Sequence, residues 1–184
     1  ELLHIGVPAS LPISMEAGAF ALSGLMIGTF GAVALAAHQI ALSMASMTFM
    51  VSVGLSQAGS IRVSNAFGRQ DWPGIRSIGR SSVVTALCYG GCCALLFILL
   101  RHEIPLVFNR DAAVVSAAAG LLVFAAVFQI SDSTQAVSAG LLRGIKDMKV
   151  PTVWIGISYW VLGIPMGCLL AFGFQMGARG IWTG

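Results

Sequence analysis

Apolar residues occupy most of the chain in long runs, which short polar stretches separate. A helix needs about 20 mostly apolar residues to cross a bilayer. Five runs of that length, at about residues 5–30, 33–63, 78–100, 112–142 and 150–172, predict five spans, and a sixth begins near Ala178. These spans must be helices, because a backbone exposed to lipid has to satisfy its hydrogen bonds within its own segment. The predicted fold class is therefore an all-α integral membrane protein.

The two ends of the chain indicate a part of a longer protein. The chain begins at Glu1 without the basic, apolar and small-residue regions of a signal peptide. It ends at Gly184, a few residues into the sixth apolar run. We therefore expect an internal fragment of a longer membrane protein.

Composition supports the lipid bilayer as the main partner. Hydrophobic residues make up 57% of the chain and charged residues only 9%, against about 25% charged residues in ordinary soluble domains. No cluster of basic residues with interleaved aromatics occurs, so a nucleic-acid partner is not expected. The four cysteines lack the paired spacing of a zinc site. We interpret them as small buried hydrophobes and predict no resident cofactor.

The polar joints between the runs predict the topology. Gly31 separates the first two spans, which we expect to form a tight helical hairpin, and residues 68–74 form a polar turn. Trp72, Arg76 and Arg80 then suggest a short interfacial helix. The loops after the second and fourth spans hold seven basic residues: Arg62, Arg69, Arg76, Arg80, Arg143, Lys146 and Lys149. The opposite side holds three: Arg101, Arg110 and Arg179. The positive-inside rule places the seven-charge side in the cytoplasm of a multi-pass protein. The expected location is a plasma membrane, specifically a bacterial inner membrane.

Two carboxylates lie deep inside predicted spans. Glu16 is near the middle of the first span, and Asp132 is near the middle of the fourth. A charged side chain at the centre of a membrane helix costs about 2.5–3.5 kcal/mol on insertion scales, so each is a functional candidate. The alternative is a protonated carboxyl that hydrogen-bonds to a neighbouring helix. Helical spacing puts Gln129 and Gln135 on the face of Asp132, with Phe128 at its edge.

A second polar stripe follows one face of the second span at steps of three and four residues, from Gln39 through Ser43 and Ser46 to Met50, Val53 and Gln57. The stripe either hydrogen-bonds to another helix or lines a cavity. His38, next to the outer turn, is expected at the interface. The candidate residues that line a substrate cavity are Phe20, Gln39, Ser43, Met50, Phe128, Gln129 and Gln135.

The pattern predicts no catalytic residue and hence no enzyme. One enzyme class is a natural comparison, because two buried carboxyls form the shared-proton dyad of an aspartyl protease. That chemistry normally uses two Asp residues in a Gly-x-Gly-Asp environment, which Glu16 and the segment Ile130-Ser131-Asp132 do not supply.

Several motifs, in order along the whole chain, carry a family resemblance. They are Gly6-Val7-Pro8 followed by Glu16, Ala37-His38-Gln39-Ile40-Ala41-Leu42, Ile104-Pro105-Leu106-Val107-Phe108-Asn109-Arg110-Asp111, Gln129-Ile130-Ser131-Asp132-Ser133 and Gly140-Leu141-Leu142-Arg143-Gly144-Ile145-Lys146-Asp147. With these motifs the chain resembles the second half of a multidrug and toxic compound extrusion (MATE) transporter of the NorM-like branch.

The resemblance implies a twelve-span transporter of two six-helix lobes. Residues 1–184 would be the C-terminal transmembrane lobe, spans seven to twelve with the last truncated, and the missing N-terminal lobe would be its partner. Such proteins are secondary active multidrug exporters, which exchange amphipathic organic cations and drugs for inward Na⁺ or H⁺ by antiport.

The resemblance also implies roles for single residues. Glu16 and Asp132 match the family's cation-coupling carboxylates, and they would be metal ligands only if the coupling ion is Na⁺. Phe128 stands where the family typically has Tyr, so that hydroxyl is not available to a cation. A lipid-linked oligosaccharide flippase of the same superfamily is the alternative function. Its cavity would be expected to carry arginines, and the predicted spans have none near their centres.

Overall fold

The structure is a computed structural model that describes the backbone of residues 2–184 and the side chains of Leu11 and of residues 14–184. The described chain is helical and contains no strand, which confirms the predicted all-α class. The first five helices are α1 (Leu2–Gly28), α2 (Ala32–Gly68), α3 (Trp72–Leu99), α4 (Glu103–Phe108) and α5 (Ala112–Gly144). A composite helix follows, made of α6 (Lys149–Gly156), η1 (Ile157–Gly163), α7 (Ile164–Cys168) and η2 (Leu169–Gly173), and α8 (Ala178–Thr183) is the last helix.

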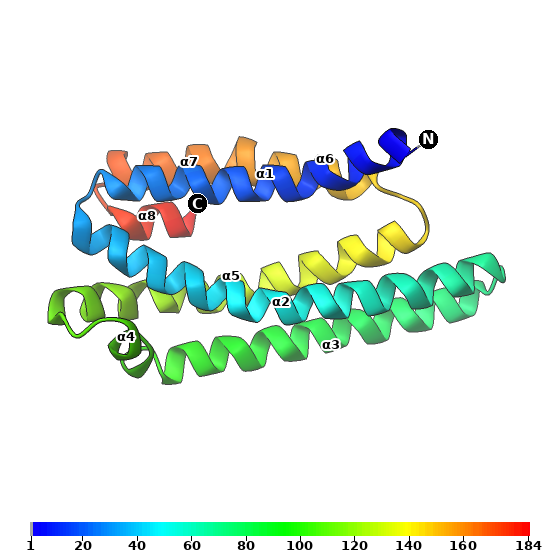
Figure 1. Ribbon diagram of the computed structural model, residues 1–184, viewed down its shortest axis with the longest axis horizontal. Coiled ribbons are helices and arrows are strands. Elements are labelled where there is room, and N and C mark those ends of the chain that lie inside the picture. Colours follow the sequence, from blue (N-terminus) through cyan, green and yellow to red (C-terminus); the bar gives the residue numbers. More distant parts are fainter. Residues whose placement is uncertain (1) are drawn as a thin grey trace.

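The long helices match the predicted spans. In the described part of the chain, α2, α3, α5 and the composite helix 149–173 are long and apolar enough to cross a membrane. Helix α1, with 27 residues, occupies the first predicted span. The loops gather at two opposite ends of the molecule (Figure 1). The α2–α3 and α5–α6 connections lie at the same end (Figure 1). Of the seven basic residues assigned to this side, Arg69 and Lys146 lie in the connections, and the other five lie on the adjoining parts of α2, α3, α5 and α6.

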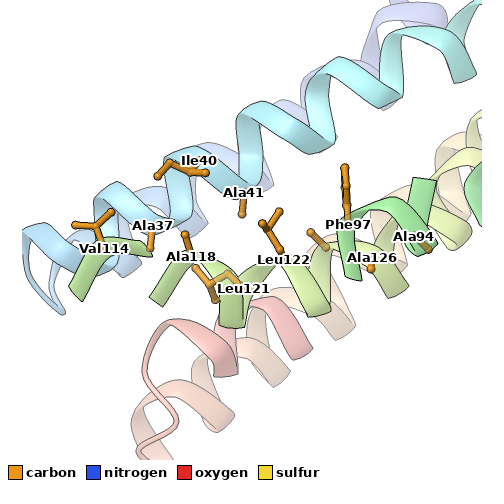
Figure 2. Close-up of a cluster of buried hydrophobic side chains, with 11 residues drawn as sticks. Ala37, Ile40, Ala41, Ala94, Phe97, Val114, Ala118, Leu121, Leu122 and Ala126 are labelled. Carbon is orange, nitrogen blue, oxygen red and sulfur yellow. The ribbon is translucent and has the colours of Figure 1, made fainter. Parts of the chain in front are cut away.

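The helices form two groups. Helices α2, α3 and α5 pack along one another, and α1 lies beside the composite helix and α8 (Figure 1). The main apolar core lies in the first group, where residues such as Ile40, Phe97, Val114 and Leu122 meet (Figure 2). Apart from Leu121, the rest of this core consists of alanines, whose small side chains let the helix axes approach closely.

Glycine and serine residues bring α2 and α5 together. A Cβ atom at Gly140 would lie 2.6 Å from the carbonyl oxygen of Ser56, so no larger residue fits there without a shift. The Ser56 hydroxyl donates to the carbonyl of Ala136 over 2.7 Å, and the Ser52 hydroxyl donates to the Ser133 hydroxyl over 2.9 Å. This contact holds the middle of α5, where Asp132 lies, firmly against α2.

The first predicted hairpin is open. Gly31 has a φ of 103°, a left-handed conformation that favours glycine, and it permits the short turn between α1 and α2. Beyond this turn the two helices diverge (Figure 1), because α1 packs on α6 and η1 whereas α2 packs on α5. The expected tight hairpin is therefore wrong for the helices, although the turn itself is short.

The expected short interfacial helix at Trp72 is also wrong. Helix α3 begins at Trp72 and continues to Leu99 without a break. The Asp71 side chain caps its start by accepting a hydrogen bond from the Gly74 amide over 2.9 Å. Arg76 and Arg80 lie on the first turns of this long helix, and Arg80 is exposed. The polar residues therefore occupy the first turns of α3 and do not form a separate helix.

The composite helix alternates α-helical and π-helical turns. Pro165 has no amide hydrogen, so the backbone of the composite helix lacks one hydrogen bond at this position. The π-helical turns of η1 directly precede this region. π-Helical turns often occur at functional sites. Here η1 carries Tyr159 and Trp160, and the Trp160 indole donates to the Met15 carbonyl over 3.1 Å, which ties the helix to α1.

Candidate functional site

A cavity of about 920 Å³ lies between the two helix groups. Helices α1, α2 and α5 supply nearly all of its lining, and Ile155 adds one side chain from α6. Most of the lining is apolar, including Phe20, Phe49 and Met50. The cavity exists because α1 diverges from α2 after the turn at Gly31.

Both deep carboxylates line this cavity. Glu16 approaches it from α1 and Asp132 from α5, so two residues far apart in the sequence share one space. Asp132 is only 5% exposed, whereas Glu16 is half-buried. Within the described part of the chain, the Oδ1 atom of Asp132 has no hydrogen-bond partner. A buried carboxyl oxygen without a partner is costly, which makes it a suitable acceptor for a cation or a proton.

The structure also brings together most of the other predicted site residues. Phe20, Gln39, Met50, Phe128 and Gln135 all line the same cavity as the two carboxylates. On α5, the lining positions recur at steps of three and four residues, as one face of a helix requires. Phe128, Asp132 and Gln135 thus share the side of α5 that faces the cavity.

Gln129 lies outside this cavity, in contrast to the expectation. Its side chain is fully buried against α2, where its Oε1 atom lies 2.9 Å from the Thr48 hydroxyl. Its amide nitrogen donates to the Ser133 hydroxyl over 3.3 Å. Gln129 lies three residues before Asp132 on α5, on the side of the helix that packs against α2. Gln129 is therefore part of the helix contact.

Ser43 is the second exception. It is exposed and does not belong to the cavity lining. The lining face of α2 is centred on Leu42, Phe49 and Val53, so Ser43 lies past its edge. The other five residues of the polar stripe line the cavity: Gln39, Ser46, Met50, Val53 and Gln57. The stripe thus overlaps the lining face, and only Ser43 lies beyond it.

The sequence predictions of the cavity lining lacked three polar residues that line it: His38, Ser56 and Arg143. Arg143, in the last turn of α5, lines the large cavity near its end. His38, expected at the interface, is only 2% exposed. The indole of Trp182, on α8, donates to His38 Nδ1 over 3.1 Å. Only the packing of the last helix against α2 explains this burial, so no local sequence signal could have found it.

A second cavity of about 560 Å³ lies between α1, α5, the composite helix and α8. Four residues line both cavities and form a partition between them: Phe20, His38, Phe128 and Gln135. The ring centroids of Phe20 and Phe128 are 5.8 Å apart in an edge-to-face arrangement. Tyr159 and Trp182 extend this aromatic contact on the side of the second cavity.

The described residues contain no group of three or more His, Cys, Asp or Glu side chains arranged to hold a metal ion. Glu16 and Asp132 are thus a pair without a third such ligand among the residues that the structure describes. Any further oxygen ligands for a coupling ion would have to come from amide, hydroxyl or carbonyl groups, such as the amide of Gln135, or from water.

Comparison with known proteins gives consistent results. The MatE family model matches residues 8–169. The chain is 40% identical over 184 residues to the "Probable multidrug resistance protein NorM" of Xylella fastidiosa, covering all of the chain and 39% of that protein. It is 40% identical over 189 residues to the "Multidrug resistance protein NorM" of Burkholderia vietnamiensis, covering 41% of that protein. The chain thus spans about two fifths of the length of these relatives.

A solved structure shares the fold. The crystal structure of the eukaryotic MATE transporter AtDTX14 matches with a TM-score of 0.92 at 23% identity. The match covers 98% of this chain and 41% of that transporter. Together with the membrane-capable helices and the bacterial relatives, these findings describe part of a multi-pass inner-membrane protein. The match of the family model over most of the chain shows that it belongs to the MatE family.

Proposed function

We propose that this chain is the C-terminal lobe of a secondary active multidrug exporter. The transporter exchanges amphipathic organic cations for inward Na⁺ or H⁺, and the N-terminal lobe of the same polypeptide completes it. One observation carries the proposal: Glu16 and Asp132, from different helices, line one largely apolar cavity of about 920 Å³. The names of the NorM relatives, which are multidrug resistance proteins, agree with it.

The geometry suits an exchange mechanism. A carboxylate in an apolar, water-poor space is unfavourable unless a proton or a cation neutralises it. A lipophilic cation and a coupling ion would compete for the same two carboxylates, so that binding of one displaces the other. Apolar side chains such as Phe20 and Met50 would hold the body of the drug. Alternating access would come from movement of the two lobes against each other.

The two carboxylates have different surroundings. Asp132 has Gln135 beside it in the cavity lining and a free carboxyl oxygen, so we assign it the role of ion ligand. Glu16 lies on a face of α1 that is otherwise small and apolar, with Ala17, Ala21 and Phe20 as neighbours. We assign Glu16 the role of proton carrier, because a carboxyl in such surroundings readily holds a proton.

The test is drug efflux by the full-length protein in proteoliposomes, under a Na⁺ gradient or a pH gradient imposed separately. Glu16→Gln and Asp132→Asn keep the side-chain shapes, so both variants should insert normally and still bind drug. In the double variant gradient-driven efflux should fall to background, because neither carboxylate remains to exchange ion for drug. Asp132→Asn should act most strongly under the Na⁺ gradient, and Glu16→Gln under the pH gradient.

Glu103→Gln is the matched control, because Glu103 is an exposed carboxylate in the first turn of α4, away from the cavity. It should leave efflux unchanged. Full gradient-driven transport by both cavity variants would refute the coupling role and leave the two carboxyls as structural hydrogen-bond partners.

A further inference from the structure

The imidazole of His38 is held in one defined state. Its Nδ1 atom accepts a hydrogen bond from the Trp182 indole over 3.1 Å. An indole nitrogen can only donate, so Nδ1 must be the unprotonated nitrogen of the neutral ring. The proton of the neutral ring then lies on Nε2. Trp182 on α8 is therefore a positioning residue, because its hydrogen bond fixes the orientation of the His38 ring and of its Nε2–H group.

This N–H group has no acceptor. His38 Nε2 is buried and, in the part of the chain that the structure describes, lacks a hydrogen-bond partner. An unsatisfied buried donor costs about 1–3 kcal/mol, and native proteins rarely leave one without a reason. His38 also belongs to the lining of both cavities, which are large enough to admit a ligand. We therefore expect the unsatisfied N–H group to bind a partner that is not part of the described protein.

The surroundings of His38 indicate what kind of molecule would use this donor. The partition places it beside Phe20 and Phe128, and Trp182 lies edge-on to its ring with centroids 5.8 Å apart. Such aromatic walls favour flat aromatic groups and cations. The described lining of the second cavity contains no Asp or Glu side chain, so the carboxylates act only from the first cavity.

We propose that His38 Nε2–H donates a hydrogen bond to an oxygen or nitrogen acceptor of the transported molecule. This inference rests on the proposed function and adds a specificity-determining residue to it. Aromatic cations that carry a hydrogen-bond acceptor bind better than cations of similar lipophilicity that carry none. The carboxylates attract the positive charge of the substrate, and His38 donates a hydrogen bond to its acceptor atom.

The experiment measures equilibrium binding of two monovalent aromatic cations to the full-length purified protein. Rhodamine 6G carries an ester carbonyl that accepts hydrogen bonds, whereas tetraphenylphosphonium has no acceptor. His38→Phe keeps an aromatic ring of similar size and removes the donor. The Kd for rhodamine 6G should rise on the order of tenfold, the size of one good buried hydrogen bond, and the Kd for tetraphenylphosphonium should stay within about twofold.

A second variant tests access to the donor without touching His38. A Cβ atom at Gly24 would lie 3.6 Å from Nε2, an ordinary van der Waals contact that the fold accommodates. Gly24→Ala should therefore shield the N–H group and produce the same selective loss of rhodamine 6G binding. Gly91→Ala on α3 is the control, because a Cβ atom there meets nothing within 4 Å and Gly91 lies outside both cavities. It should change neither Kd.

The outcomes distinguish a failure of the proposed role of His38 from a failure of the proposed exporter function. Equal weakening of both cations by His38→Phe, or no change in either, overturns the role of the donor while the exporter proposal stands. A wild-type protein that binds neither cation overturns the proposed function, and the inference with it. Selective loss in both His38→Phe and Gly24→Ala supports the assignment.

Discussion

Replacing Gly140 by alanine should loosen the contact that holds the candidate site. The new Cβ atom would lie 2.6 Å from the backbone carbonyl oxygen of Ser56, and real Cβ atoms essentially never approach other atoms closer than 3.0 Å. The obstacle is backbone, which cannot rotate away as a long side chain can. Helices α2 and α5 must therefore separate locally.

The cost follows from two losses. Forcing an extra carbon into a well-packed contact costs about 1–3 kcal/mol. Separation also weakens the hydrogen bond from the Ser56 hydroxyl to the Ala136 carbonyl, 2.7 Å long at present, and a hydrogen bond of this kind contributes about 0.5–1.5 kcal/mol. Together these effects predict a loss of about 2–4 kcal/mol in the free energy of unfolding for Gly140→Ala.

The measurement is unfolding of the full-length protein in mixed micelles with increasing SDS, followed by tryptophan fluorescence. Gly54→Ala is the control, because Gly54 lies inside α2 and a Cβ atom added there meets nothing within 4 Å. Alanine is the better helix former there, so this variant should gain about 0.5–1 kcal/mol or stay neutral. A Gly140→Ala protein as stable as the wild type would contradict the reasoning from backbone contact.

Two further predictions test the helix contact and the topology. Gln129→Leu should lower the free energy of unfolding by about 1 kcal/mol, because it removes hydrogen bonds to Thr48 and Ser133. It should leave the substrate profile unchanged. A changed profile at normal stability would contradict the placement of Gln129 in the helix contact and support a place in the cavity lining. A cysteine at Asn109 should react with impermeant reagents only from outside, and one at Asn65 only from the cytoplasm. The reverse labelling would overturn the orientation derived from the basic residues.

The sequence by itself determined the class of the protein and the positions of its spans. Long apolar runs can be satisfied only by membrane helices, so their number and approximate bounds follow from local composition. Glu16 and Asp132 could be selected without a structure for the same reason: a charged group inside an apolar run is costly and therefore conspicuous. Helical periodicity then identified neighbours such as Gln135 on the face of Asp132.

Only the tertiary structure decided which of these faces meet. The divergence of α1 from α2 opens the cavity, and it depends on which helices pack together at a distance along the chain. The rotation of α2 and α5 about their axes placed Gln129 in the helix contact and left Ser43 outside the lining. His38 became a buried donor because Trp182, 144 residues later, packs against it. Periodicity defines a face but not its partner, since the partner is set by the shape and size of side chains on other helices.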